Sequence, residues 1–387
     1  MLNLARSLAS HKLINLKPKY VHIDNLIFRC HYRVTVLILL IGVALLSSQE
    51  YIGEYISCIH ENNQLRAVIN RFCFFMATFT VVKHHNRSVL NREIAHPGVG
   101  PYVQSEGEEI IRHTYYQWVI FVLFLQAVFF YLPHVVWREM EQGKLKGIID
   151  GMKEIEMVNE TYKKESFKRI ELHLKNRLYI NRSWALCLIF CELLNLLNLI
   201  LQVYLTDVFL GYHFWDLGTK IYWDEKGDEF NPLDVVFPKV TKCSFQKFGP
   251  SGSIQHHDIM CIMALNIVNE KIYLVLWFWY IFLFIASVLA LIWRFATFFL
   301  RHSLPFNRFV FNFTSMSKIN EEHLRIVMNR VSFGEWIFLS YLAGSMNSKL
   351  FDDLLSQLAE SYNEKIFTSD EKLAELEETK RPLVEFK

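Results

Sequence analysis

The sequence has little charge. Asp, Glu, Lys and Arg together make up 21 % of its 387 residues, whereas apolar residues make up 52 %. A soluble chain of this length needs more charge to cover its surface, and a disordered chain has far fewer apolar residues. The 41 basic and 39 acidic residues leave a net charge of +2. This balance excludes a protein that binds nucleic acid over its whole surface.

The sequence also lacks the motifs that many enzymes carry. It has no glycine-rich phosphate loop, no Ser nucleophile elbow and no Cys–His signature. The adjacent pairs His84–His85 and His256–His257 have no further His or carboxylate at helical spacing, and adjacent side chains do not share a helix face. We therefore expect no catalytic residue, no metal site and no cofactor.

Four long apolar runs predict membrane-spanning helices. The strongest runs from Ile272 to Trp293 without any charged residue, which argues against the core helices of a large soluble protein. Lipid offers the backbone no hydrogen-bond partner, so each span must be helical. The residues before the first run are too many and too mixed for a signal peptide, so this span is expected to stay in the mature chain. We place the spans at residues 32–48, 115–137, 184–205 and 272–293.

Basic residues predict the orientation of the chain. Of the 41 Lys and Arg residues, 29 lie in residues 1–33, 138–183 and 294–387, and 12 lie in residues 49–114 and 206–271. Lys and Arg favour the cytoplasmic side of a membrane. Both termini and the middle loop are therefore expected in the cytoplasm, and 49–114 and 206–271 are expected to be outer loops.

The larger cytoplasmic segments are expected to be helical. In the middle loop, residues 138–183, acidic and basic side chains alternate at helical spacing from residue 152 to residue 178. Residues 294–368 are expected to form a helical C-terminal domain, in which a second helical pattern from Glu321 to Tyr362, interrupted near Gly334 and Gly344, predicts a small bundle. Residues 369–387 are charged and are predicted to be disordered.

Four of the seven cysteines lie in the outer loops. Cys58 and Cys73 belong to the first loop, and Cys243 and Cys261 belong to the second. An even set of cysteines outside the cell is typical of a disulfide framework. Four cysteines allow three pairings, and their spacing does not choose among them. The other three lie in or beside the spans and are expected to be buried thiols.

The second and third spans contain residues that a lipid-facing helix avoids. Pro133 ends the apolar stretch of the second span and is expected to kink the helix or to close it there. Glu192 is an intramembrane acid and therefore a candidate functional residue. Asn195 and Gln202 share its helix face, and Asn198 lies close to that face. Packing between helices is the favoured interpretation, and lining of a pore is the alternative.

Two segments outside the spans carry further patterns. Residues 1–31 begin with an amphipathic stretch, Met1 to Leu16, for which a helix lying on the membrane surface is one interpretation. A plug or funnel in a pore is the other. Asn86 begins an N-glycosylation sequon in the first outer loop and is a candidate for modification.

Several longer motifs resemble those of one family, the innexins. The element Tyr115-Tyr116-Gln117-Trp118-Val119, at the entry to the second span, resembles the innexin signature. The second outer loop resembles innexins from Val236 through Cys243 and Cys261 into the fourth span. Two cysteines in each outer loop also match this family. The resemblance extends over nearly the whole chain up to about Tyr362.

The resemblance implies a fold and a function. Innexins are four-helix subunits of ring-shaped large-pore channels in the plasma membrane, with rings typically of eight subunits. Two rings in apposed cells dock through their outer loops to form a sixteen-subunit gap junction. The implied fold is an all-α membrane protein with two disulfide-linked outer loops and a helical cytoplasmic dome. The implied partners are further copies of this chain, other innexins and membrane lipids, and no nucleic acid.

The resemblance also implies roles for individual residues. It pairs Cys58 with Cys261 and Cys73 with Cys243. It places the N-terminal helix in the pore as a funnel, with its narrowest part lined by Met1, Leu2, Asn3 and Leu4.

The chain departs from the usual innexin pattern in the first outer loop. Tyr55 stands where the family usually has Pro, and Phe74 stands where it usually has Trp. A glycan at Asn86 would keep two rings apart. The favoured function is therefore a gap-junction subunit, and the first alternative is an undocked hemichannel that passes small solutes. A non-conducting adhesion protein, or one that modifies other innexins by co-assembly, is the remaining alternative.

Overall fold

The structure is a computed structural model, which forms two compact units. The first comprises Met1–Asn25, Val135–Glu192 and Ala290–Lys387 and is called the helical unit. The second comprises Leu26–His134 and Leu193–Leu289 and is called the helix–sheet unit. The structure describes residues 24–48, 54–60, 63–85, 96–101, 107–143, 145, 147, 178–219, 233–315, 319–345 and 348–362.

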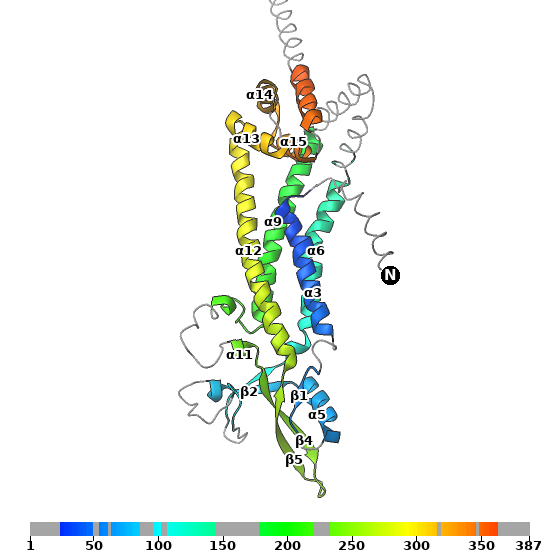
Figure 1. Ribbon diagram of the computed structural model, residues 1–387, viewed down its shortest axis with the longest axis vertical. Coiled ribbons are helices and arrows are strands. Elements are labelled where there is room, and N and C mark those ends of the chain that lie inside the picture. The colour runs from blue at the N-terminus through cyan, green and yellow to red at the C-terminus, as the bar shows by residue number, and fades with distance from the viewer. Residues whose placement is uncertain are drawn as a thin grey trace, which may run out of the picture. The chain divides into compact units, whose positions relative to one another are not determined.

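Within the residues that the structure describes, four helices are long and apolar enough to cross a membrane (Figure 1). The first, Leu26–Ser47, consists of α2 (Leu26–Arg29), a π-helical turn (Cys30–Val34) and α3 (Thr35–Ser47). The others are α6 (Val119–Glu141), α9 (Leu178–Phe209) and α12 (Ala264–Leu300). The four predicted spans are thus confirmed as candidate membrane helices. Several of these helices run past the predicted limits, because helical structure continues beyond the apolar run.

Helix α6 continues through Pro133 to Glu141. The expectation that Pro133 closes the helix is therefore wrong. Proline has no N–H to donate to the carbonyl of Phe129, one turn earlier. The side-chain amide of Asn198, on α9, donates to that carbonyl oxygen over 3.3 Å. A neighbouring side chain thus supplies the donor that the helix lacks at this point.

The expected all-α fold is also wrong in the outer loops, although the described chain is mostly helical. In the described part of these loops, five antiparallel strands form one sheet in the order β1-β5-β4-β2-β3. The longest pair, β4 and β5, forms a hairpin whose turn is closed by Gly249 N–H donating to Ser253 O over 2.8 Å. The strands are β1 (Ser57–Cys58), β2 (Thr78–Val81), β3 (Ile110–His113), β4 (Val240–Phe248) and β5 (Ile254–Ile262).

Helix α5 (Asn63–Met76) packs against β1 and β4 of this sheet. It has one apolar face, on which Ile69 and Cys73 are completely buried. The helix ends at Met76, and the following residue, Ala77, has a φ of 72° in the left-handed region and turns the chain into β2. The first loop thus contributes a helix and three short strands, and the second loop contributes the hairpin.

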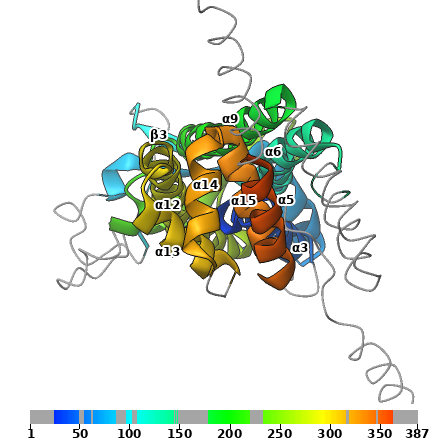
Figure 2. The ribbon, with the colours of Figure 1, turned by 90° about the horizontal axis from the view of Figure 1, so that it is seen from above.

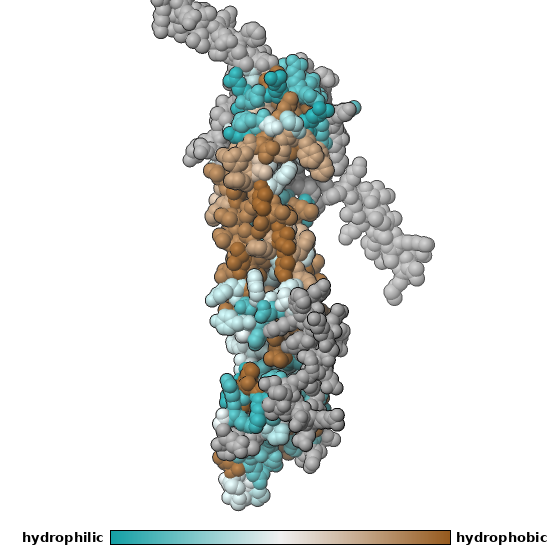
Figure 3. Space-filling model, turned by 90° about the vertical axis from the view of Figure 1, so that its left-hand side faces the viewer, coloured by the Kyte–Doolittle hydropathy of each residue, from teal (hydrophilic) through white to brown (hydrophobic). Residues whose placement is uncertain are grey.

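The long helices of the helix–sheet unit expose apolar side chains to their surroundings. Figure 3 shows brown, apolar surface over these helices. The exposed fraction of Phe121 is 66 %, and that of Leu289 is 59 %. Such a surface is unfavourable in water and suits a lipid environment.

In the helical unit, three helices follow the end of α12. They are α13 (Leu304–Ser315), α14 (Glu321–Arg330) and α15 (Phe333–Ser345), and residues 348–362 are also helical. Figure 2 shows α13, α14 and α15 side by side. The expected helical pattern is present, but Gly334 and Gly344 lie inside α15, and the first break falls at residues 331–332.

Several predicted features lie outside the described residues. They are the candidate pore residues Met1, Leu2, Asn3 and Leu4, the sequon at Asn86, the charged pattern of 152–177 and the tail 369–387.

Candidate functional sites

The first candidate site is the pair of disulfides that joins the two outer loops. Cys58 on β1 is bonded to Cys261, which lies directly opposite on β5. Cys73 on α5 is bonded to Cys243 on β4. These are the two bonds that the family resemblance implies. The sulfur atoms of Cys58, Cys73 and Cys261 lie within 4.8 Å of one another and are buried. Because all of them are held in disulfides, this cluster offers no thiolate to a metal ion.

Asn70 connects α5 to the first disulfide. Its side-chain oxygen accepts a hydrogen bond from the Cys58 N–H over 2.9 Å, and its amide nitrogen donates to Glu54 over 2.9 Å. Asn70 is buried. The short strand β1 is therefore held on both sides, by β5 through the ladder and by α5 through this amide.

The signature motif stabilises the end of helix α5. Tyr116 donates its hydroxyl hydrogen to the carbonyl of Phe74 over 3.1 Å, and Gln117 donates its amide hydrogens to the carbonyls of Phe74 and Phe75 over 2.6 and 3.2 Å. The last carbonyls of a helix have no partner inside that helix. Tyr116 and Gln117 supply these partners and so connect the start of α6 to the helix that carries Cys73.

The other signature residues have different environments. Tyr115 packs edge-on against Phe237, and burial raises the pKa of the Tyr115 phenol well above its usual value. Val119 is buried, whereas the exposed fraction of Trp118 is 59 %. An exposed Trp at the end of an apolar helix is typical of the membrane–water interface. In this motif, Tyr116 and Gln117 therefore cap helix α5, and Trp118 lies at the end of the span.

The two first-loop positions at which this chain departs from the usual innexin residues contact each other. The rings of Tyr55 and Phe74 stack with centroids 5.9 Å apart. Phe74 also packs against Tyr116 of the signature, at 5.4 Å. The two departures are thus part of one aromatic cluster beside the disulfides.

Two histidines meet at Thr80 of β2. The Thr80 hydroxyl lies 2.9 Å from Nε2 of His113 and 3.2 Å from Nε2 of His85. Burial, with a smaller contribution from His85, lowers the pKa of His113 to about 4. Burial, with a smaller contribution from His84, also lowers the pKa of His85. These rings are therefore neutral at physiological pH.

Two glycines let a turn of the first loop cover the histidine pair. A Cβ atom at Gly98 would lie 2.7 Å from the His85 ring, and one at Gly100 would lie 2.7 Å from the His84 ring. His84 Nε2 lies 3.0 Å from the carbonyl oxygen of Pro101 in the same turn. The rings of His84 and His85 thus pack against this turn of the first loop.

Lys242 ties this turn to the second loop. Its ammonium group donates to the carbonyl of Gly100 over 2.5 Å and forms an ion pair with Asp258 over 2.6 Å. The Lys242 side chain is only 6 % exposed, so the ion pair is partly desolvated. Together with the disulfides, this contact makes the two loops one structural element.

The tip of the β4–β5 hairpin exposes apolar side chains. Phe248, at the end of β4, is 76 % exposed, and Ile254, at the start of β5, is 56 % exposed. They are partners in the strand register. Figure 1 shows the hairpin projecting beyond the other strands. These two side chains form an apolar patch at its end.

Polar side chains connect the long helices of the helix–sheet unit. His31 Nε2 lies 2.8 Å from the Ser287 hydroxyl, and Gln126 donates to the Thr206 hydroxyl over 2.7 Å. The side chain of Asn195, on α9, is also buried. Hydrogen bonds of this kind are a usual means of holding helices together in lipid.

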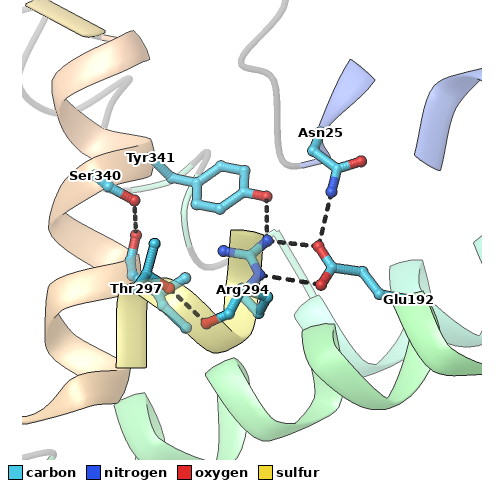
Figure 4. Close-up of polar contacts among 7 residues, drawn as sticks. Asn25, Glu192, Arg294, Thr297, Ser340 and Tyr341 are labelled. Atoms are coloured by element: carbon cyan, nitrogen blue, oxygen red, sulfur yellow. Dashed lines mark hydrogen bonds and ion pairs between the residues drawn. The ribbon is translucent and has the colours of Figure 1, made fainter. Parts of the chain in front are cut away.

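The second candidate site is a buried ion pair in the helical unit (Figure 4). Arg294 of α12 donates to Glu192 of α9 through two nitrogens, Nη2 over 2.5 Å and Nε over 3.0 Å. Asn25 donates to the same carboxylate over 2.7 Å. The two charged side chains are 12 % and 5 % exposed. The bidentate geometry and the third donor satisfy a carboxylate that would otherwise be costly to bury.

Tyr341 joins this ion pair to helix α15. Arg294 Nη2 donates to the Tyr341 hydroxyl over 3.4 Å. Burial raises the pKa of Tyr341, although Arg294 beside it acts in the opposite direction. One guanidinium group therefore connects α9, α12 and α15, and Asn25 adds the segment that precedes the first span.

Sequence reasoning identified Glu192 but not Arg294, Asn25 or Tyr341. In the structure Glu192 contacts other segments of the chain, as the packing interpretation requires. Arg294 is the first charged residue after the uncharged run that ends at Trp293. A cation at the end of one span is a natural partner for an acid in another, and this signal was available in the sequence.

Comparisons with known proteins agree with this architecture. The family model described as Innexin matches residues 24–362. Innexin inx7 of Drosophila melanogaster is 41 % identical over 358 residues, which cover 88 % of this chain and 81 % of that protein. Innexin inx3 of the same organism is 37 % identical over 339 residues, covering 87 % and 84 %. Innexin inx2 of Drosophila melanogaster is 38 % identical over 351 residues, which cover 89 % of this chain and 92 % of that protein.

Proposed function

The chain belongs to the innexin family, and we propose that it forms gap-junction channels that pass ions and small molecules between adjacent cells. Innexins are membrane channel proteins that form gap junctions or hemichannels, and they are not enzymes. The chain is accordingly a subunit of an oligomeric membrane channel. Docking of two such oligomers is the part that we propose.

In the proposed assembly, eight copies form a ring in the plasma membrane, and two rings dock into a sixteen-subunit junction. Both termini and the middle loop lie in the cytoplasm, as the distribution of Lys and Arg favours. The N-terminal helix enters the pore, with Met1 to Leu4 at its narrowest part. Other innexins join the same ring where they are expressed together.

The joined outer loops are the observation that carries this proposal. Two disulfides, the Lys242 contacts and one continuous sheet hold the loops together. A surface that is ordered in advance loses less conformational entropy when it binds. The exposed Phe248 and Ile254 at the hairpin tip suit a surface that another ring covers.

An undocked hemichannel is the second candidate function. The observation that favours it is the contact between Tyr55 and Phe74, because the usual innexin residues are absent at both positions. The sequon at Asn86 acts in the same direction, since a glycan would hold two rings apart.

Dual voltage clamp on pairs of touching cells that lack their own junctions tests the proposal. We expect a junctional current, and we expect Cys58→Ser and Cys261→Ser to abolish it. Cys187→Ser, which changes a free cysteine outside the outer loops, is the matched control and should leave the current unchanged.

Surface biotinylation establishes that each variant reaches the plasma membrane. Wild-type protein at the surface without junctional current would reject the homotypic gap junction. Dye uptake by single cells would then support the hemichannel, and a current restored by Asn86→Gln would identify the glycan as the obstacle. Absence of both uptake and current would favour a non-conducting role.

A further inference from the structure

Helix α13 has two faces of opposite environment. On its inner face Asn307 and Phe311 are completely buried, and Val310 is nearly so. On its outer face Phe309 is 63 % exposed and Phe313 is 78 % exposed. The two outer rings lie nearly parallel, with centroids 6.3 Å apart. Such a pair of exposed aromatic rings, one helical turn apart, usually marks an interaction surface.

The inner face fixes the position of α13 relative to the end of α12. Asn307 donates to the carbonyl of Arg301, just beyond α12, and accepts from the Trp336 indole on α15 over 2.7 Å. Phe306 packs against both Trp293 of α12 and Trp336. The outer face therefore keeps one orientation with respect to the last turns of α12.

A shallow groove runs along the outer face. It has a volume of about 610 Å³. Its one basic side chain, Arg308, forms an exposed ion pair with Glu321 over 2.7 Å. The remaining lining is mostly apolar or uncharged: Leu304, Pro305, Phe309, Asn312 and Phe313. The groove therefore offers apolar walls beside one exposed ion pair, that of Arg308 with Glu321.

The end of α12 also exposes apolar side chains. Phe295 and Phe299 are 67 % and 64 % exposed and pack edge-on at 4.9 Å. Arg301 lies 5.7 Å from the ring of Phe298. Aromatic and basic residues at the end of a membrane helix are typical of the lipid headgroup region. Because α12 is a candidate span, α13 begins where the bilayer surface is expected.

We propose that the outer face of α13 lies in the bilayer interface and binds a phospholipid. An acyl chain packs on Phe309 and Phe313, and the phosphate lies beside Arg308, whose guanidinium then bridges it and Glu321. An amphipathic helix in this position buries its apolar face at the boundary between headgroups and acyl chains. The position of α13 directly after a candidate membrane span favours lipid over a second copy of the chain as the occupant of the groove.

Photocrosslinking of the full-length channel in liposomes of phosphatidylcholine and phosphatidylserine tests this proposal. The photoreactive residue p-benzoylphenylalanine replaces Phe309 or Phe313, and in a matched control it replaces Glu322, an exposed residue of α14. After illumination, intact mass spectrometry of the subunit should show phospholipid adducts at both Phe positions and none at the control. Dimers of the subunit crosslinked through position 313 would instead assign the face to a neighbouring copy and overturn the proposal. Equal adducts at all three positions, or none, would overturn it as well.

A second measurement uses natural side chains. Native mass spectrometry counts the phospholipids that remain bound to the oligomer after extraction in mild detergent. The double variant Phe309→Ser/Phe313→Ser should retain fewer phospholipids than wild type, and Phe309→Leu/Phe313→Leu should retain as many as wild type. The oligomer peak in the same spectrum shows whether each variant assembles. Equal retention by the Ser variant, with the oligomer intact, would contradict the proposal.

Discussion

The side-chain amide of Asn198 on α9 donates to the backbone carbonyl of Phe129 on α6, the carbonyl that Pro133 leaves without its helical donor. A buried polar group without a partner is costly in lipid, where no water replaces the lost bond. Asn198 and Pro133 are far apart in sequence, but the side chain of Asn198 replaces the backbone donor that Pro133 lacks. Their dependence on each other is measurable.

The Asn198→Leu variant should lose about 1–2 kcal/mol of stability in the wild-type background, because the Phe129 carbonyl becomes unpaired. In a Pro133→Ala background, the alanine N–H supplies the bond within the helix, and the same substitution should cost much less. A double-mutant cycle on the thermal unfolding midpoint of the detergent-solubilised protein measures this coupling. Equal costs in the two backgrounds would show that Asn198 does not serve the proline.

Removing one partner of the ion pair between Glu192 and Arg294 should be strongly destabilising. Glu192→Leu leaves a buried guanidinium without its carboxylate, and such losses typically cost about 3–5 kcal/mol. Glu192→Leu/Arg294→Leu removes both charges and should recover much of this loss. Glu139→Leu changes an exposed acid of α6 and serves as the control. Thermal unfolding that is no lower for Glu192→Leu than for the control would refute a structural role for the pair.

Tyr116→Phe should weaken the connection between α5 and α6. The variant keeps the aromatic packing but leaves the Phe74 carbonyl with one donor fewer, at a cost of about 1 kcal/mol. Adding Gln117→Ala removes the other donor and should lower the unfolding midpoint further. Tyr204→Phe, at an exposed tyrosine of α9, is the matched control. A midpoint for Tyr116→Phe that equals the control would argue against the capping function of the signature.

The stability of the outer loops should fall as the pH is lowered from 6.5 towards 4. Burial holds the pKa of His113 at about 4 in the folded protein, below its ordinary value of 6.5. Between these values the unfolded chain binds the proton and the folded chain does not, so acid favours unfolding. At pH 5 the cost from His113 alone is about 2 kcal/mol relative to pH 7.5.

Unfolding midpoints at pH 7.5 and pH 5 measure this effect. His113→Gln should reduce the difference between the two midpoints, whereas His96→Gln, at an exposed histidine, should not. An unchanged pH dependence in His113→Gln would contradict the assignment.

Gly98 and Gly107 provide a matched comparison of two left-handed glycines. Their φ values are 76° and 68°, so alanine should cost about 1–2 kcal/mol at either position through backbone strain. Only at Gly98 would the added Cβ also meet the His85 ring and Thr80. Gly98→Ala should therefore lower the unfolding midpoint of the protein more than Gly107→Ala. Equal shifts would mean that the turn moves away from the histidines without cost.

The four spans were predictable because the signal for each lies in consecutive residues. An uncharged run such as Ile272–Trp293 has few alternatives to a membrane helix, whatever the rest of the chain does. The ends of the spans were less predictable. Helix α12 begins at Ala264 and reaches Leu300, because the helical backbone continues past both ends of the uncharged run.

The outer loops were predicted less well. Their four cysteines indicated a disulfide framework, but the spacing left three pairings open, and only the family resemblance chose among them. The sheet was missed, although its β4–β5 hairpin lies within one loop; the pairings of β1 with β5 and of β2 with β4 join the two loops. Strand β2, for example, contacts β4 at Phe79 and Lys242. No local periodicity reports a pairing between residues so distant in the chain.

The sequence by itself determined the class of the protein, the number of spans, the cysteine content of the loops and the family. These properties depend on composition and on short motifs, which can be recognised without coordinates. Only the tertiary structure decided the partners of the buried polar groups: Glu192 with Arg294, Asn198 with the Phe129 carbonyl, and Tyr116 with the end of α5. The physical reason is that a buried polar atom needs a partner within about 3 Å in space. The partner can come from any part of the chain, so the order of residues in the sequence does not reveal it.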